Sequence, residues 1–107
     1  MSLLETMSFK DLEEKVSAIA EKFFFAKGFC DYPGTERIAE EDDYYDDFLL
    51  KVQEAYSILN ECDKNLINNE FFYQSYSQWW RALYSKATFY RYKKEAMQRF
   101  LGAFYHV

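Results

Sequence analysis

The stretch SKATFYRYKKEAMQRFLGAFY, residues 85–105, decides the fold class, because its apolar residues recur every three or four positions. At about 100° per residue, four of them fall within a sector of about 80°: Phe89, Tyr92, Ala96 and Phe100. Ser85 can cap such a helix at its N-terminus. The pattern predicts a helix over residues 86–105 whose apolar stripe faces the core.

Similar spacing recurs upstream, and it predicts helices over residues 9–27, about 42–60, 64–72 and 78–84. Ser8 and Asp63 are the expected N-caps of the first and third of these helices, and Gly28 the expected C-cap of the first. Turns are expected over residues 30–34 and 73–76. Three Gly and one Pro leave little material for β-hairpins. We therefore expect a single all-α domain of about five helices spanning residues 1–107.

The charge of the chain is divided between its two parts. Residues 1–75 hold 7 Lys or Arg against 17 Asp or Glu, whereas residues 76–107 hold 6 Lys or Arg against a single acid, Glu95. The net charge of −5 argues against a polyanionic partner for the whole chain. Such a partner could still meet the basic segment alone. The last third of the chain is therefore the candidate binding segment.

The face of the last helix opposite its apolar stripe is small, polar and cationic. It carries Ala87, Tyr90, Arg91, Lys94 and Gln98, with Lys86 and Lys93 at its margins. One α-helix fits into the major groove of DNA, where such a face offers donors to base edges and cations to phosphates. The pattern favours duplex DNA as a partner. The alternative is a solvated face that only covers a core, because cations near a helix C-terminus also suit the helix dipole and solubility.

Residues 84–96, YSKATFYRYKKEA, resemble the recognition helix of bacterial sigma factor region four and of related phage-type transcription regulators. The shared features are a Ser cap, a basic residue, a small residue and Thr, then aromatic and basic residues leading to an Ala eleven positions after the cap. The resemblance covers about residues 60–101. It implies a helix-turn-helix that docks its second helix in DNA. The implied contacts are Ser85, Lys86 and Thr88 near phosphates and Tyr90, Arg91 and Lys94 near the groove.

On this interpretation the chain is a small bacterial or phage regulator that binds DNA or touches the transcription machinery. Residues 61–105 would form the helix-turn-helix-like unit and residues 8–60 an acidic two-helix support. The alternative is an acidic helical adaptor that binds a protein partner through the aromatic cluster near Trp79 and Trp80. Ten of the chain's 23 aromatic residues lie between Phe71 and Tyr92. Most should form core, with Trp79 or Trp80 the more exposed, since adjacent helix positions point about 100° apart.

Other classes of function find little support in the sequence. Cys30, Cys62 and His106 are the only residues of their types, too few for a zinc site or a disulfide scaffold, and buried free thiols are expected. A nucleophile would lack a nearby base, because the one His is next to the C-terminus. We therefore expect no enzyme activity, no cofactor and no small-molecule substrate.

The acids in residues 36–47 suit the start of a helix, where the dipole favours them. They lack the glycine-centred loop of a calcium site, so no metal is expected there. No apolar run approaches the roughly 20 residues of a membrane span, and no secretory leader is evident. The sequence predicts a cytoplasmic protein without a membrane partner.

Overall fold

Helices make up most of the part of the chain that the computed structural model describes, residues 6–31, 39–73 and 78–105, and no strand occurs there. The elements are α1 (Phe9–Asp31), α2 (Ala39–Ser57), α3 (Glu61–Ile67), the π-helix η2 (Asn68–Phe72), the 3-10 helix η3 (Trp79–Ala82) and α4 (Lys86–Tyr105). The expected all-α class is confirmed, with four α-helices and two short helical segments among the described residues.

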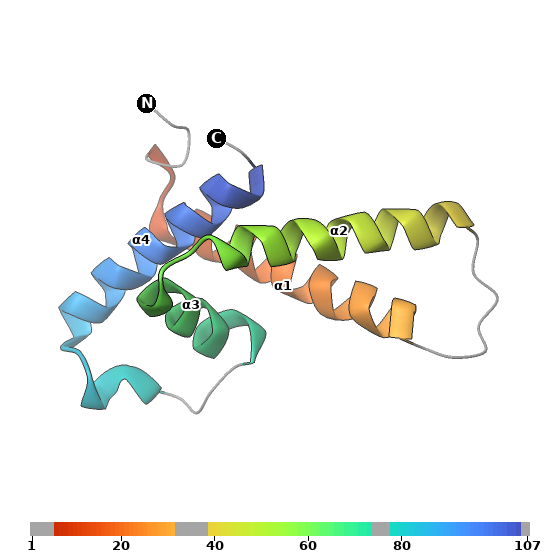
Figure 1. Ribbon diagram of the computed structural model, residues 1–107. Helices are drawn as coiled ribbons and strands as arrows, with labels where there is room; N and C mark the ends of the chain where they lie inside the picture. Colours follow the sequence, from red (N-terminus) through yellow and green to blue (C-terminus); the bar gives the residue numbers. More distant parts are fainter. Residues whose placement is uncertain (1–5, 32–38, 74–77, 106–107) are drawn as a thin grey trace.

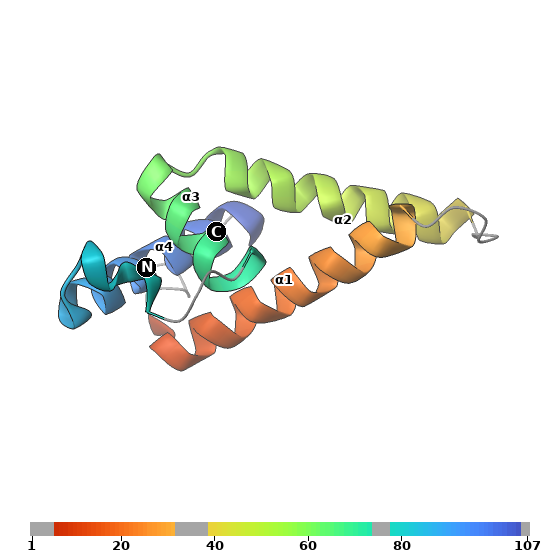
Figure 2. The same cartoon turned by 90° about the horizontal axis from the view of Figure 1, so that it is seen from below.

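Helices α1 and α2 pack against each other and enclose part of the core (Figure 1). They converge where α1 ends and α2 begins and splay apart at the other end, where α3, η2 and α4 lie between them (Figure 2). Helix α4 contacts α1, α2 and α3. One side of α4 is therefore held by every other α-helix of the fold.

Two of the predicted N-caps are confirmed by their hydrogen bonds. The Ser8 hydroxyl accepts a hydrogen bond from the backbone N–H of Asp11 at 3.2 Å, at the start of α1. The Ser85 hydroxyl accepts one from the backbone N–H of Thr88 at 3.3 Å, at the start of α4. In both cases a hydroxyl satisfies a backbone donor that has no partner within the helix. Helix α4 begins and ends where the sequence predicts.

Gly28 does not end the first helix, which continues to Asp31. A glycine inside a helix costs only about 1 kcal/mol relative to alanine, so a single glycine need not end the helix. Helix α2 runs from Ala39 to Ser57 instead of over residues 42–60. It ends in a turn in which the Leu59 N–H donates to the Tyr56 carbonyl at 3.1 Å, and Asn60 then adopts an extended conformation, with φ −72° and ψ 168°. The expected turn over 30–34 is helical at 30 and 31; its remainder and residues 74–76 lie outside the described residues.

The cap of α3 is Asn60 and not Asp63. The Asn60 side chain accepts a hydrogen bond from the backbone N–H of Asp63 at 2.8 Å. Asp63 does lie within two residues of the helix start, as predicted, but its carboxylate is buried and sits 3.2 Å from Arg99 Nε of α4. Burial raises the pKa of Asp63, and Glu95 adds to the rise, although the Arg99 guanidinium opposes it. Asp63 faces α4, so its carboxylate serves packing between helices and not the cap.

Substitution of Asn60 by alanine should lower the free energy of unfolding by about 1 kcal/mol, because the N–H of Asp63 then loses its acceptor. Asn60→Ser supplies another capping oxygen and should retain most of the stability. Urea titrations followed by circular dichroism would measure both changes. Equal stability of Asn60→Ala and the parent protein would show that this cap contributes nothing.

The prediction of an α-helix over residues 78–84 is wrong. A single 3-10 turn, η3, occupies this segment. Gln78 precedes it in the left-handed region, with φ 60°. The two adjacent tryptophans of this turn make different contacts. The Trp79 indole donates to Glu70 Oε2 at 2.9 Å, while the Trp80 ring stacks on Phe89 with ring centroids 4.5 Å apart. Both neighbouring tryptophans therefore make contacts with other elements.

The buried stripe of α4 includes the predicted Phe89, Ala96 and Phe100. Tyr92, also predicted there, is only half-buried. The stripe is rotated toward residues that the prediction left out: Lys93, Met97, Leu101 and Phe104. Met97, Leu101 and Phe104 join the buried residues of α1, α2 and α3 in one core cluster.

Candidate functional site

The outward face of α4 carries the residues that the sequence places near a DNA groove. Lys86, Tyr90, Arg91 and Lys94 are all exposed, together with Ala87. Among the described residues, no carboxylate forms an ion pair with Lys86, Arg91 or Lys94. Their three charges are therefore open to solvent on one helix.

The acid closest in sequence to these cations is paired within the helix. Glu95 Oε2 lies 3.5 Å from Arg99 Nη2, one turn further on. Both side chains are partly exposed, so this i, i+4 pair contributes little stability. It does keep the one acid of α4 from neutralising Arg91 or Lys94. We call the set Lys86, Arg91 and Lys94 the basic face of α4.

Ser85 and Thr88, expected near phosphates, lie beside the basic face at the helix start. The Ser85 hydroxyl donates to Thr88 Oγ1 at 2.9 Å while it accepts from the Thr88 backbone N–H. Their first role in the structure is therefore to cap α4. The same arrangement places the positive end of the helix dipole at this edge of the face, where an anion is favoured.

Tyr90 makes ring contacts with two other elements, although 42% of its surface remains exposed. Its ring meets the edge of Phe9 from α1 at 5.6 Å and lies 6.4 Å from Trp80 of η3. The Arg91 guanidinium lies 5.2 Å from the centre of the Tyr92 ring. These contacts restrict the two side chains that would approach base edges.

Lys93, expected at the margin of the exposed face, is buried instead, with 7% of its surface exposed. Its Nζ donates to Glu13 Oε2 at 2.8 Å and to Glu70 Oε1 at 2.9 Å. Burial disfavours the charged form, but the two hydrogen-bonded carboxylates outweigh it and raise the pKa of Lys93. The ammonium also lies 5.2 Å from the centre of the Phe71 ring.

This buried ion-pair cluster connects four elements. Glu13 belongs to α1, Glu70 to η2 and Lys93 to α4, and Glu70 also accepts from the Trp79 indole of η3. The side of α4 behind the basic face is thus fixed by ionic and apolar contacts together. The sequence contained a signal for it: Lys93 precedes Met97, Leu101 and Phe104 by 4, 8 and 11 positions, which places it on their side of the helix.

The aromatic cluster that was expected to meet a protein partner is mostly core. Trp79 is 8% exposed and Trp80 is half-buried against Phe89, so neither tryptophan is exposed. Exposed rings occur elsewhere, at Phe24, Phe25, Tyr44, Tyr73 and Tyr105 besides Tyr90.

The prediction of buried free thiols is wrong for Cys62. This cysteine is free but exposed, and its Sγ lies 3.7 Å from the Tyr84 hydroxyl. The side chain of Cys30 lies outside the described residues, as do those of the acids from 36 to 43. The described part of the chain contains no group of three or more His, Cys, Asp or Glu able to hold a metal ion. Among the described helices, none has the length and apolar character needed to cross a membrane.

No family model, no curated protein and no solved structure matches this chain. The candidate site is therefore defined by the geometry of the basic face alone.

Proposed function

We propose that this protein binds duplex DNA through the basic face of α4 and acts as a small transcription-associated regulator. The observation that carries the proposal is the exposure of Lys86, Arg91 and Lys94 on one helix, without an ion pair to any described carboxylate. Phosphates supply the missing counter-charges. The last third of the chain is basic although the chain as a whole is acidic, so DNA would approach α4 and avoid the acidic remainder.

The packing of α4 supports this role. A helix that enters a groove has to present its side chains from a fixed position, because binding otherwise requires it to be ordered first. Helix α4 buries seven residues, and Lys93 ties it to α1 and η2. The 20 residues of α4 extend over about 30 Å, enough for its exposed N-terminal half to contact a groove while its C-terminal half packs on α2.

Arg91→Ala and Lys94→Ala should each weaken duplex binding by about 1 to 3 kcal/mol if the side chain contacts a base. Neither substitution should lower the helix content, since both residues are exposed. Fluorescence anisotropy with a labelled genomic duplex at about 50 mM salt would measure the affinity. Lys27→Ala is the matched control. It removes the same charge from an exposed site near the C-terminal end of α1, outside the basic face of α4, and should change binding little.

The salt dependence of the affinity tests the proposal independently of any mutation. If the three cations of the basic face contact phosphates, log K should fall with log salt with a slope of about −2 to −3. Lys86→Ala should reduce that slope by about 1 if Lys86 contacts a phosphate. Absence of duplex binding by the parent protein at about 50 mM salt would contradict the proposed function.

A second candidate is a protein-interaction module, favoured by the exposed rings beside η2. Phe24 and Tyr73, with 43% and 66% of their surfaces exposed, lie with ring centroids 6.4 Å apart, and Phe25 on the next position of α1 is 62% exposed. Clustered exposed aromatic residues are typical of interaction surfaces. The DNA titration separates the two candidates, because an adaptor of this kind would show neither duplex binding nor the steep salt slope.

A further inference from the structure

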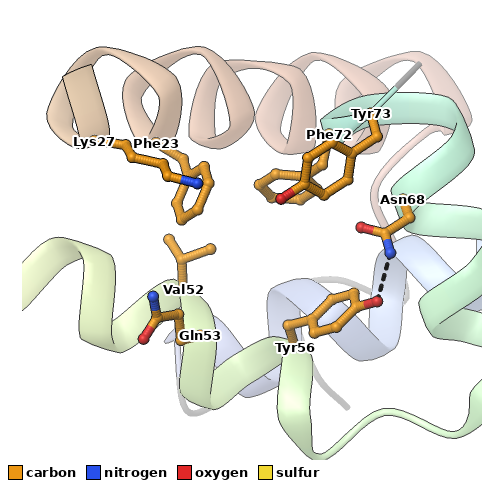
Figure 3. A pocket seen from close by; sticks show the side chains of 8 residues that line it. All are labelled: Phe23, Lys27, Val52, Gln53, Tyr56, Asn68, Phe72 and Tyr73. Atoms are coloured by element: carbon orange, nitrogen blue, oxygen red, sulfur yellow. Dashed lines mark hydrogen bonds between the residues drawn. The ribbon is translucent and has the colours of Figure 1, made fainter. Parts of the chain in front are cut away.

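A pocket of about 270 Å³ opens between α1, α2 and η2 (Figure 3), and no residue of α4 lines it. Its apolar walls are Phe23 of α1, Val52 of α2 and Phe72 of η2. Each of these three side chains is buried in the core cluster. The pocket therefore has a firm apolar interior supplied by three different elements.

The π-helical turn of η2 supplies one side of the pocket. The backbone carbonyl of Asn68 accepts from the N–H of Tyr73, five residues on, at 2.8 Å. This wider turn brings Asn68, Phe72 and Tyr73 to the same opening, where Figure 3 shows them facing α1 and α2. Single π-turns of this kind occur frequently at functional sites.

Polar groups of the pocket are ordered by one hydrogen bond. The Asn68 amide nitrogen donates to the Tyr56 hydroxyl at 2.6 Å. The hydroxyl oxygen thus serves as acceptor, and its proton is left to donate to a ligand. The pKa of Tyr56 is raised, chiefly by burial and further by Glu61, although the Asn68 hydrogen bond opposes the rise. Figure 3 shows the other amide atom of Asn68, its oxygen, turned toward the pocket.

The charge of the lining is unlike that of the surrounding chain. Residues 1–75 contain 17 acids, yet no carboxylate lines the pocket, and Lys27 is its one charged residue. Figure 3 shows the Lys27 amino group beside the ring of Phe23, on the pocket side of α1. No described carboxylate forms an ion pair with Lys27. A cation beside an apolar cavity that lacks acids is suited to an organic anion.

We propose that this pocket binds a small organic carboxylate with an aromatic or short aliphatic body. The carboxylate would pair with Lys27, and the body would lie between Phe23, Val52 and Phe72. At about 270 Å³ the pocket lies just below the range of about 300 to 1,000 Å³ that is usual for drug-sized ligands, so a ligand as small as benzoate suits it. This site is separate from the basic face of α4, so its occupancy is measured on the protein alone and does not depend on DNA binding.

The test uses benzoate as the probe and benzamide as its neutral counterpart of the same shape. Titrations of the ¹⁵N-labelled protein should shift the amide resonances of residues around Phe23, Val52 and Asn68, with a benzoate dissociation constant of about 1 mM or below. Lys27→Met keeps the aliphatic stem and removes the charge. It should weaken benzoate at least about threefold and leave benzamide unchanged, because only benzoate gains from the cation.

Two further variants locate the ligand. Gln53, exposed at the rim, can be replaced by tryptophan to fill the opening, and Gln53→Trp should abolish binding of both probes while the circular dichroism spectrum stays helical. Lys22→Met is the matched control, since Lys22 lies over Tyr44 and Phe48 in a different hollow, and it should bind benzoate as the parent protein does.

Three results would overturn the proposal. The first is an absence of shifts around the pocket up to about 10 mM benzoate. The second is an affinity for benzoate that Lys27→Met leaves unchanged. The third is weakening by Lys22→Met, with shifts around Phe48 and Phe104, which would place the anion in the other hollow.

Discussion

Replacement of Lys93 by methionine should lower the free energy of unfolding by about 3 kcal/mol. Lys93 is 7% exposed and donates to Glu13 and Glu70. Methionine keeps the apolar stem but leaves the two carboxylates without their cation. Removal of one partner from a buried ion pair costs about 3 to 5 kcal/mol, and the side chain of Glu13 is 40% exposed, so the lower end applies. Urea unfolding monitored by circular dichroism would measure the loss.

Lys94→Met is the control for this substitution, since it removes the same charge from the next position of the same helix. Lys94 is exposed and forms no ion pair with a described residue, so its loss should change stability by less than about 0.5 kcal/mol. Glu70→Gln combined with Lys93→Met should recover part of the stability, because a neutral amide needs no counter-charge. Equal stabilities of Lys93→Met and Lys94→Met would contradict the role of the buried ion-pair cluster.

The same cluster gives a pH dependence on the alkaline side. The pKa of Lys93 is raised in the fold above its usual 10.5, despite the opposing effect of burial. The folded protein therefore holds this proton more tightly than the unfolded chain does. The stability that Lys93 supplies is complete below about pH 10.5 and is lost as the pH rises through the higher pKa of the folded state.

The bounds of α4 could be predicted because its signals are local. Ser85 is an N-cap whose hydrogen bond involves only the first turn of its own helix, and the apolar period continues to the end of the helix. Exposure of Lys86, Arg91 and Lys94 follows from the same period. Signals of this kind need no knowledge of what packs on the helix.

The partners of buried charges could not be predicted, because they come from distant parts of the chain. Lys93 pairs with Glu13, 80 positions away, and with Glu70, 23 positions away. Asp63 has the residue type of a cap, and only its position opposite Arg99 makes it a buried ion-pair member. The pocket beside Lys27 depends on a π-turn, and no residue type in the sequence predicts the hydrogen bond of that turn.

The α-helix predicted over residues 78–84 is wrong at a place where two large residues are adjacent. The apolar period does not show that Trp79 and Trp80 both lie against one ring, that of Phe89. The indole of Trp79 also needs an acceptor when buried, and Glu70 provides it. Both rings lie near Phe89, and η3 is the short turn that carries them.

Phe100→Ala should cost about 3 to 5 kcal/mol of unfolding free energy, the usual range for truncation of a buried phenylalanine. Phe100 is 0% exposed and lies at the middle of the α4 stripe. Its ring centroid is 6.0 Å from that of Phe72 and 6.3 Å from that of Phe104, so the truncation removes contacts to η2 and within α4 together. A chain of this length has about 5 to 15 kcal/mol of total stability. The melting temperature should therefore fall by about 15 °C or more.

The size of this loss also tests whether the core is shared between the basic face and the pocket. Phe72 lines the pocket and packs on Phe100, whereas Phe100 lies on the helix that carries the basic face. Ile58→Ala, at a site 72% exposed, should change stability by less than about 0.5 kcal/mol and serves as control. Phe100→Leu retains part of the volume and should lose less than Phe100→Ala, which keeps the comparison available if the alanine variant does not fold. An unchanged melting temperature for both variants would show that Phe100 is not in the core. A large loss would show that Phe100 belongs to the core in which α4 packs on η2.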